Sequence, residues 1–389
     1  MDPIVITGIG ITTALGSGLE ANHRALREGR AGIGRLELFK SRYDGLLPVA
    51  EIKTTDAVLR ERLNAHERGV TRTMLLALEA FNEAVADAGI LSFGRVALVC
   101  GNTVGGMCLT DELYRDAHKQ SDGSEYLSSY DGGSIALYLQ ERFGIGGVID
   151  SMNTACSSSA NAIGYGARLI RHGLADTVIA GGVDALAKFT INGFNALHIL
   201  SPEPCRPFDE TRQGLNLGEG AAFVVLQRER PGQRVYARLT GFGNSNDAFH
   251  PSSLSDEGDG PYLAMAEALE TAGLAPRDIS YINAHGTATE NNDLVEGIAM
   301  TRLFGPGGVP PFASTKSFTG HTLGAAGAVE AVFSVLGLVH DEAYPSLRCT
   351  QPIAALTPVT SLTSLPMEHI MSNSFGFGGN CSSLVFSKA

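Results

Sequence analysis

The amino-acid sequence predicts a layered α/β protein made of two similar halves. Strand-like and helix-like segments alternate along the 389 residues, a pattern typical of α/β architectures. Three pairs of similar segments also recur, in the same order, in the first and second parts of the chain. Because binding sites often form between such units, we expect the functional site to lie between the two halves.

The first elements follow from local patterns. Residues 4–7 and 96–99 are short apolar runs rich in Val and Ile, and they predict buried strands. Residues 74–88 have helical composition, and Gly89 supplies the left-handed residue that commonly ends a helix. The first half therefore begins with a strand, a helix and a second strand.

The repeat links distant parts of the chain. Helix-like residues 84–89 precede strand 96–99, as residues 268–273 precede the strand-like segment 279–282. Cys156 and Lys316 each open a helix of small residues, and residues 219–225 resemble residues 379–385. The same offset of 160 residues separates Cys156 from Lys316 and Gly220 from Asn380. We therefore predict halves at 1–231, carrying the nucleophile, and 232–389, carrying the catalytic histidines.

The first half is longer between its first and second repeat elements. The excess falls at about residues 110–134. Insertions of this kind often build a lid, a pocket wall or a subunit interface, so we expect extra structure there.

Composition excludes several function classes. The net charge of −12 and the lack of a sustained basic block argue against nucleic acid as the main partner. No run of 18 apolar residues predicts a membrane span, and the N-terminus lacks the pattern of a secretory signal. The six cysteines include no CxxC pair, so we expect no zinc or other metal site, and free thiols suit a cytoplasmic location.

One basic stretch stands out in this acidic chain. It contains Arg60, Arg62, Arg68 and Arg72. Such a stretch can be an ordinary solvated helix face, or it can be a local docking patch for an acidic partner.

Cys156 is the first candidate for chemistry. It follows an apolar segment and a short turn, and a helix of small residues comes after it. A cysteine at a helix N-terminus meets the positive end of the macrodipole, which favours the nucleophilic thiolate, and free N–H groups there can bind an oxyanion. A buried and inert thiol is the alternative.

The second half contributes further candidates. His285 directly follows a predicted buried strand, where open α/β sheets deliver catalytic groups. Lys316 and His321 flank a turn into a helix of small residues, and Glu330 lies further along that helix, where it can neutralise Lys316. Phe375 lies in a segment in which glycines alternate with aromatics, which lets the backbone approach a ligand closely.

The ordered set of Cys156, His285, Lys316, His321 and Phe375 resembles the β-ketoacyl-acyl carrier protein synthases of the thiolase-like superfamily. The resemblance covers essentially the whole chain and includes residues 206–209 and 218–221. It is strongest to the elongating type with two catalytic histidines. It implies a thiolase-like fold with layers in the order α-β-α-β-α.

The resemblance implies a role for each matching residue. Cys156 would accept an acyl group from a carrier-bound thioester, and the N–H groups of Cys156 and Phe375 would form an oxyanion hole. His285 and His321 would stabilise the enolate formed when malonyl-acyl carrier protein loses carbon dioxide. Lys316, with Glu330, would hold the histidines. Phe375 would also act as a gate.

The resemblance extends to binding sites and partners. Thr287 and Thr289 would contact the phosphopantetheine arm of the carrier, and Val104 would limit acyl chain length. Arg68 and Arg72 would help the acyl carrier protein to dock, and a homodimer or a heterodimer with a related ketosynthase-like subunit is implied. The reaction would be a decarboxylative Claisen condensation that needs no cofactor of its own.

Two alternatives share the fold. A degradative thiolase would need a second reactive cysteine, for which Cys381 is the candidate. A chain-length-factor-like subunit would lack the active cysteine, whereas Cys156 is present.

The acyl substrate depends on residues 126–134, which we expect to form a second pocket wall across a dimer interface. Asp131 in this stretch would be costly beside an aliphatic chain. We therefore favour a polyketide or polyene pathway, with fatty-acid elongation as the close alternative.

Overall fold

The computed structural model describes residues 3–119 and 123–389. The helices in chain order are α1 Leu19–Arg27, α2 Asp56–Leu63, α3 Arg72–Asp87, α4 Thr110–Lys119, α5 Ser134–Phe143, α6 Ser158–Arg171, α7 Lys188–Ala196, α8 Asp259–Ala272, α9 Glu290–Phe304, α10 Lys316–Thr319 and α11 Ala326–His340. The strands are β1 Ile4–Thr13, β2 Gly16–Ser17, β3 Val96–Gly101, β4 Ile149–Met152, β5 Thr177–Asp184, β6 Gly220–Arg228, β7 Ala237–Asn246, β8 Tyr281–Asn283, β9 Phe312–Ala313, β10 Glu342–Ala343, β11 Thr363–Ser364, β12 His369–Phe375 and β13 Asn380–Ser387.

The strand order makes the predicted repeat visible. One mixed sheet runs β4-β3-β5-β6-β1 and then β7-β13-β12-β8-β9. In each half, a long strand, β1 or β7, lies at the centre of the whole sheet, and the strand after the first repeat helix, β3 or β8, lies next to the edge. The halves meet where β1 pairs antiparallel with β7 through Val5–Arg238 and Ile6–Ala237. The order of the second half therefore repeats that of the first in reverse, as a twofold relation requires.

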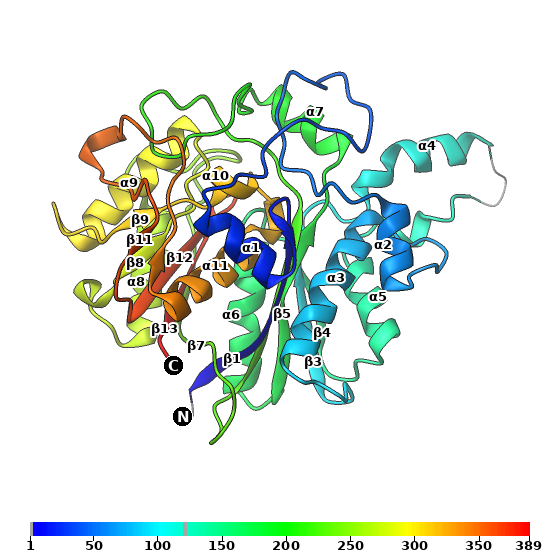
Figure 1. Cartoon of the computed structure of the whole chain (residues 1–389), viewed down its shortest axis with the longest axis horizontal. Coiled ribbons are helices and arrows are strands. Elements are labelled where there is room, and N and C mark those ends of the chain that lie inside the picture. Colours follow the sequence, from blue (N-terminus) through cyan, green and yellow to red (C-terminus); the bar gives the residue numbers. More distant parts are fainter. Residues whose placement is uncertain (1–2, 120–122) are drawn as a thin grey trace.

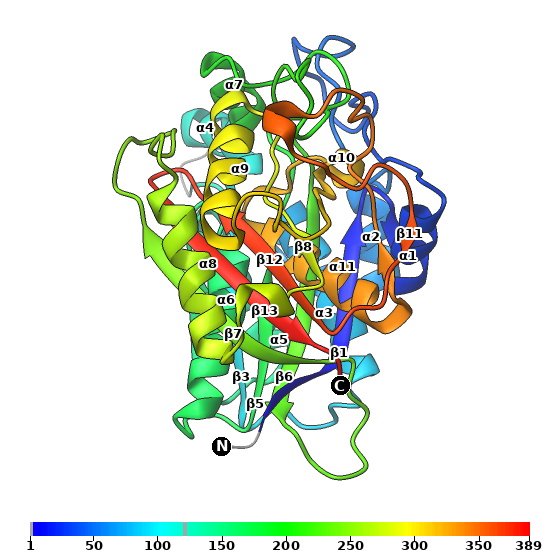
Figure 2. The same cartoon turned by 90° about the vertical axis from the view of Figure 1, so that its left-hand side faces the viewer.

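The helices form three layers around the two halves of this sheet (Figure 1). Helices α6 and α11 pack against each other between the halves, with α6 on β3 and β5 and α11 on β12 and β6. Helices α3 and α5 cover the outer face of the first half, and α8 covers the outer face of the second, with α9 beside it (Figure 2). The expected α-β-α-β-α layering is present.

Local sequence explains the main helix boundaries. Helix α3 begins at Arg72, two residues before the predicted start, because the Thr71 side chain accepts a hydrogen bond from the Met74 N–H. Gly89 follows its end with φ of 65°, the left-handed conformation expected of it. The predicted strands at 4–7 and 96–99 lie within β1 and β3, which are buried throughout.

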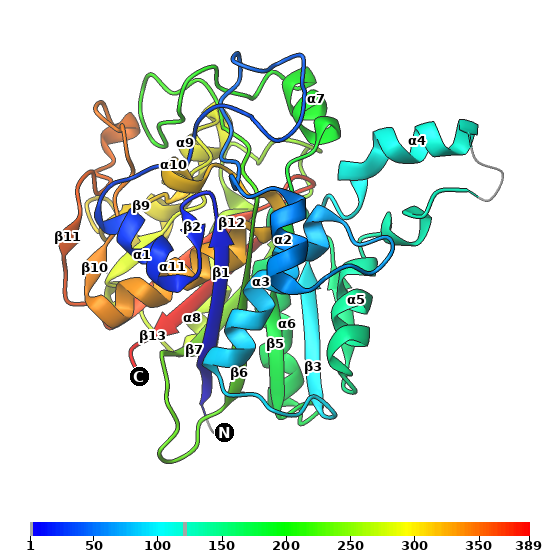
Figure 3. The ribbon, with the colours of Figure 1, turned by 45° about the vertical axis from the view of Figure 1, so that its right-hand side comes forward.

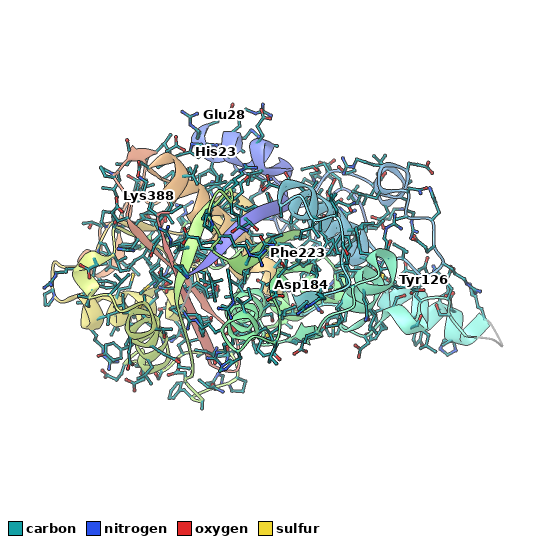
Figure 4. All side chains as sticks on the ribbon, turned by 90° about the horizontal axis from the view of Figure 1, so that it is seen from below. His23, Glu28, Tyr126, Asp184, Phe223 and Lys388 are labelled. Atoms are coloured by element: carbon teal, nitrogen blue, oxygen red, sulfur yellow. The ribbon has the colours of Figure 1, made fainter. Side chains whose placement is uncertain are left out.

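The predicted insertion contains extra structure. Helix α4 projects away from the body of the protein, and the segment after it carries Tyr126 (Figures 3 and 4). An apolar groove on this arm is lined by Leu113, Tyr114, Leu127 and Tyr130. Residues 120–122 of the insertion lie outside the described residues.

Within the described residues, one helical stretch, Leu323–His340, has the length and composition to cross a membrane. However, 89% of it is buried inside the protein, where it contributes to the central helical layer. The stretch is thus a core helix of this fold.

Candidate functional site

A cleft of about 610 Å³ lies between the two halves. Cys156 comes from the first half, and His285, His321 and Phe375 come from the second. Its walls are formed by the end of α7, the start of α9 and the loop after β12; α7 and α9 lie at the same end of the molecule (Figure 2). The cleft therefore lies beyond the carboxyl ends of several parallel strands, where α/β sheets commonly bind ligands.

Cys156 lies on a tight turn between β4 and α6. Ala155, just before it, has φ of 54°, a left-handed conformation that is uncommon for a residue with a Cβ atom. The Ser158 hydroxyl holds this turn, since it donates to the Ala155 carbonyl at 2.5 Å and accepts from the Thr154 N–H at 2.9 Å. The strained turn directs Cys156 into the cleft, although its side chain is only 6% exposed.

Both histidines lie against Cys156. The Cys156 Sγ is 2.9 Å from His321 Nε2, and one ring nitrogen of each histidine lies within 4.8 Å of the sulfur. The ring centroids of His285 and His321 are 5.4 Å apart, and the rings are nearly perpendicular. The sequence prediction that these residues form one site is thus met by the geometry.

The hydrogen bonds at Nδ1 determine where each imidazole carries its proton. The Leu323 N–H donates to His321 Nδ1 at 3.3 Å, and the Lys316 ammonium donates to His285 Nδ1 at 3.1 Å. Because Nδ1 is an acceptor in both rings, each neutral ring carries its proton on Nε2. Each ring therefore offers one N–H donor on the side away from these contacts.

The histidines are held in the neutral form. Burial lowers the pKa of His285 and of His321 well below the ordinary value, and the positive charge of Lys316 lowers both further. Neutral N–H donors can stabilise an oxygen on which negative charge develops without giving up a proton.

The pKa of Cys156 differs from the sequence prediction. Burial raises the pKa of the thiol to about 11, although Lys316 and the Phe377 N–H act in the opposite direction. Cys156 lies just before the N-terminus of α6, which begins at Ser158, but its burial opposes the charged thiolate. Burial thus favours the thiol form of Cys156 over the thiolate.

Lys316 and Glu330 form the expected buried ion pair. The Lys316 ammonium contacts a Glu330 carboxylate oxygen and also donates to the His285 carbonyl oxygen at 2.7 Å. Burial raises the pKa of Glu330 to about 7, while Lys316 acts to lower it. The other carboxylate oxygen of Glu330 has no partner among the described residues. The pair therefore links the helix α11 to the backbone and ring of His285.

The predicted binding residues divide into two groups. Thr287, Thr289 and Phe375 line the cleft, and the two threonine hydroxyls lie 2.9 Å apart. Val104 does not line it; its side chain is 2% exposed and packs in an apolar cluster with Leu186, Ile191, Leu215 and others. Val104 thus forms part of a closed wall.

The prediction that Arg72 docks a carrier is wrong. Its side chain is 10% exposed, and its guanidinium donates to the buried Glu219 carboxylate and to Asp56. These ion pairs join the start of α3 to the start of β6, which is a structural role. Arg68 is 80% exposed and pairs with Glu125, so it is accessible to a partner.

Sequence reasoning missed a second layer of polar residues. Asp184 lies in the interior (Figure 4), where its carboxylate accepts from the backbone N–H groups of Thr103, Val104 and Gly324. Its position at the end of the apolar strand β5 is the feature of the sequence that could have identified Asp184. Phe194 and Phe377 also line the cleft, and their rings stack with centroids 5.8 Å apart. Because the two residues come from different halves, no local sequence pattern indicates this pair.

Known proteins share both the sequence and the structure. Models of the N-terminal and C-terminal domains of β-ketoacyl synthases match residues 1–231 and 236–350. A 3-oxoacyl-[acyl-carrier-protein] synthase 2 of Vibrio harveyi is 32% identical over 410 residues, covering 99% of this chain and 98% of the relative. A mitochondrial 3-oxoacyl-[acyl-carrier-protein] synthase of Arabidopsis thaliana is 32% identical, covering 98% of this chain and 92% of the relative.

Solved structures agree. A ketosynthase (ApeO) in complex with its chain length factor (ApeC) from Xenorhabdus doucetiae matches with a TM-score of 0.86 and 33% identity, covering 100% of this chain and 98% of that chain. A β-ketoacyl synthase from Burkholderia phymatum matches with a TM-score of 0.87 and 30% identity, covering 100% of both chains. The fold is thiolase-like, and the chain belongs to the β-ketoacyl synthase family of condensing acyltransferases.

Proposed function

We propose that this protein joins an acyl group held on Cys156 to the two-carbon unit of malonyl-acyl carrier protein, with loss of carbon dioxide. The observation that carries this proposal is the meeting of one thiol and two neutral imidazoles in a single cleft, with Lys316 behind them. The product is a β-ketoacyl group on the carrier.

The first step is acyl transfer. Cys156 Sγ attacks the carrier-bound thioester, the carbonyl carbon forms a bond to the sulfur, and the carrier thiol leaves with the cysteine proton. The N–H groups of Cys156 and Phe377 are the proposed oxyanion donors, because the backbone N–H that faces the Cys156 sulfur is that of Phe377 rather than that of Phe375, which the sequence had suggested. Burial raises the pKa of the thiol and so makes a free thiolate costly. The oxyanion donors therefore have to stabilise the negative charge as it forms during the attack.

The second step is decarboxylation and bond formation. The bond to the malonyl carboxylate breaks, carbon dioxide leaves, and the electron pair forms an enolate whose oxygen accepts from the His285 and His321 N–H groups. The enolate carbon then attacks the acyl carbonyl, the carbon–sulfur bond breaks, and the Cys156 sulfur takes up one proton from solvent. The two steps balance without an oxidant or a reductant, so the proposal requires no cofactor beyond the phosphopantetheine of the carrier.

The proposed partners follow from the relatives. A solved type II polyketide ketosynthase in complex with its acyl-carrier protein has a TM-score of 0.89 at 25% identity. We propose that an acyl carrier protein docks at the cleft mouth with Arg68 as one contact, in the cytoplasm, and that the chain forms a homodimer or pairs with a related ketosynthase-like subunit. In the second case this chain is the catalytic member, because it carries Cys156.

The degradative thiolase alternative finds no support at Cys381. This cysteine is buried in β13, where its thiol contacts the Gly379 carbonyl oxygen, and it is not among the residues that line the cleft. Burial also raises its pKa above the ordinary range. Cys381 is therefore not placed to exchange a proton at Cys156.

For the substrate, we propose elongation of a polyketide or polyene chain. The solved structure of the ishigamide ketosynthase/chain length factor, which this chain matches with a TM-score of 0.93 and 27% identity, supports this choice. The synthase 2 relatives favour fatty-acid elongation as the second candidate. Asp131 does not discriminate between them, because it is exposed and its carboxylate accepts from the Gly133 N–H, so the desolvation argument does not hold for this chain.

Carbon dioxide release from malonyl-acyl carrier protein tests the reaction. We expect release by the wild-type protein, an acyl adduct on Cys156 by mass spectrometry, and loss of the adduct in Cys156→Ser. His285→Ala and His321→Ala should each suppress decarboxylation while acylation of Cys156 persists in part. An adduct on another cysteine, or normal decarboxylation by either histidine variant, would contradict the assignment.

Competition among saturated, polyunsaturated and aromatic acyl-carrier substrates of equal length decides the pathway. A preference for polyunsaturated or aromatic chains is expected. A clear preference for the saturated chain would assign the protein to fatty-acid elongation.

A further inference from the structure

Asn380 lies at the start of β13, directly after the glycine-rich loop that follows Phe375. Its side-chain oxygen accepts three hydrogen bonds, from the Ser157 hydroxyl at 2.7 Å, the Asn161 amide at 2.7 Å and the Asn244 amide at 3.1 Å. Three donors around one oxygen fix the orientation of the Asn380 amide. Two of these donors belong to the other half of the protein, beside the nucleophile.

The backbone of Asn380 holds the glycine-rich loop. Its carbonyl oxygen accepts from the Gly376 N–H at 2.7 Å, and Gly376 is the residue after Phe375. A Cβ atom on Gly376 would lie 2.5 Å from the Thr154 carbonyl oxygen, so the loop packs directly on the turn that carries Cys156. The loop and the turn therefore touch, and Asn380 is bonded to both.

The same network holds the nucleophile turn. Ser157 donates to the Thr154 carbonyl oxygen at 2.7 Å, and Asn161 donates to the Thr154 hydroxyl at 2.9 Å. Between them lies Ala155 with its left-handed backbone, a conformation that persists only when its surroundings enforce it. The single hydroxyl proton of Ser157 is shared between the Thr154 and Asn380 oxygens, so loss of the Asn380 oxygen would turn it wholly to Thr154. Because Ser157 is fully buried, water would not readily take the place of Asn380.

We propose that Asn380 is a positioning residue that sets the separation of the two oxyanion donors, the N–H groups of Cys156 and of Phe377, which directly follows Gly376. The two donors lie on different halves, and Asn380 joins the segments that carry them, by its side chain on one side and its backbone on the other. This inference rests on the proposed function, because it concerns the acyl-transfer step at Cys156.

The proposal separates two activities. Acyl transfer uses the N–H pair that Asn380 holds. Decarboxylation uses His285 and His321, and their contacts run through Lys316 and Leu323 rather than through Asn380. A change at Asn380 should therefore affect acyl transfer far more than decarboxylation.

The test compares Asn380→Leu with Asn380→Asp. Leucine removes the acceptor at similar volume, whereas aspartate keeps an oxygen for Ser157 and Asn161. We expect Asn380→Leu to lower kcat for acyl loading of Cys156 by about 10- to 100-fold, the effect of a misplacement of the order of 1 Å. KM and the rate of malonyl decarboxylation should change by less than about twofold, and Asn380→Asp should restore most of the acyl-transfer rate.

Controls separate positioning from loss of stability. Asn22 is fully buried and bonded to Thr13, Gly16 and Gly18 in the N-terminal segment, so Asn22→Leu should lower thermal stability without changing the ratio of the two activities. Asn161→Ala breaks the same network from the side of Cys156 and should reproduce the selective loss of acyl transfer. This variant therefore tests the proposal even if Asn380→Leu does not fold.

Equal loss of both activities in Asn380→Leu and Asn161→Ala, or no recovery in Asn380→Asp, would overturn the positioning role. Failure of the proposed function is a different result, since the wild-type protein itself would then neither take up an acyl group nor release carbon dioxide.

Discussion

Lys316→Met is the most informative single substitution, because Lys316 supports both His285 and Glu330. Methionine keeps much of the apolar stem but removes the ammonium that lies 3.1 Å from His285 Nδ1 and contacts the Glu330 carboxylate. His285 then loses the donor that fixes its proton on Nε2, and Glu330 becomes an unpaired buried carboxylate.

The magnitudes follow from these contacts. At an effective dielectric constant of about 20, a unit charge at 3.1 Å disfavours protonation of the His285 ring by ~5 kcal/mol, part of which Glu330 already offsets. The pKa of His285 should therefore rise toward its ordinary value. We expect decarboxylation at pH 7 to fall by roughly 10²- to 10³-fold, as for loss of an oxyanion donor. The rate should also become dependent on pH between 6 and 8, whereas that of the wild type is flat because its histidines stay neutral.

Stability should change with a definite sign. The pKa of Glu330 is already raised to about 7 in the folded protein and should rise further without Lys316, so this residue favours the folded state at low pH and disfavours it as pH rises. Removal of one partner of a buried ion pair costs about 3–5 kcal/mol. We expect a cost in this range at pH 8 and a smaller one at pH 6, where Glu330 is protonated.

Carbon dioxide release from malonyl-acyl carrier protein and urea unfolding at pH 6 and pH 8 measure both effects. The matched control is Lys316→Met with Glu330→Gln, which should recover stability at pH 8 but neither the decarboxylation rate nor the flat pH profile, because Lys316 is still missing beside His285. Wild-type decarboxylation in Lys316→Met, or the same loss of stability at both pH values, would refute the reasoning.

Three further predictions concern Cys156 and the basic stretch. Alkylation of Cys156 by iodoacetamide should accelerate by about tenfold per pH unit from pH 7 to 9, because burial raises the pKa of the thiol to about 11; a plateau below pH 8 would contradict this. Arg68→Glu should raise KM for carrier-bound substrates at low salt with little change in kcat, and an unchanged KM would exclude Arg68 from docking. Arg72→Glu should instead lower the free energy of unfolding by about 3–5 kcal/mol, as urea denaturation would show, since it places a second carboxylate beside the buried Glu219.

Local sequence patterns and the internal repeat were enough to predict the fold and the central residues of the site. The strands that contain residues 4–7 and 96–99 are fully buried, so their sequences are almost purely apolar and easily recognised. The ion pair of Lys316 with Glu330 was also predictable, because its members are only 14 residues apart and a lysine among small residues needs a counter-charge, although they lie in separate helices, α10 and α11.

The remaining features depend on contacts between distant segments. Arg72 is buried because Glu219, 147 residues away, lies beside it in the folded chain, and no local pattern distinguishes it from the exposed Arg68. The link between Asn380 and Ser157 spans 223 residues. At Cys156 the helix N-terminus that favours the thiolate is visible in the sequence, whereas the burial that raises the pKa of the thiol is not.

The reversed strand order of the two halves has an electrostatic consequence. It brings the starts of two central helices, α6 at Ser158 and α11 at Ala326, toward the same cavity, with Cys156 just before the one and His321 just before the other. Each start leaves backbone N–H groups without helical partners and carries a partial positive charge. Both intermediates of the proposed reaction, a tetrahedral oxyanion and an enolate, are anions. The backbone thus supplies similar positive charge at both helix starts. Only the side chains near them, Cys156 at one and His321 at the other, distinguish the nucleophile from the proton donor.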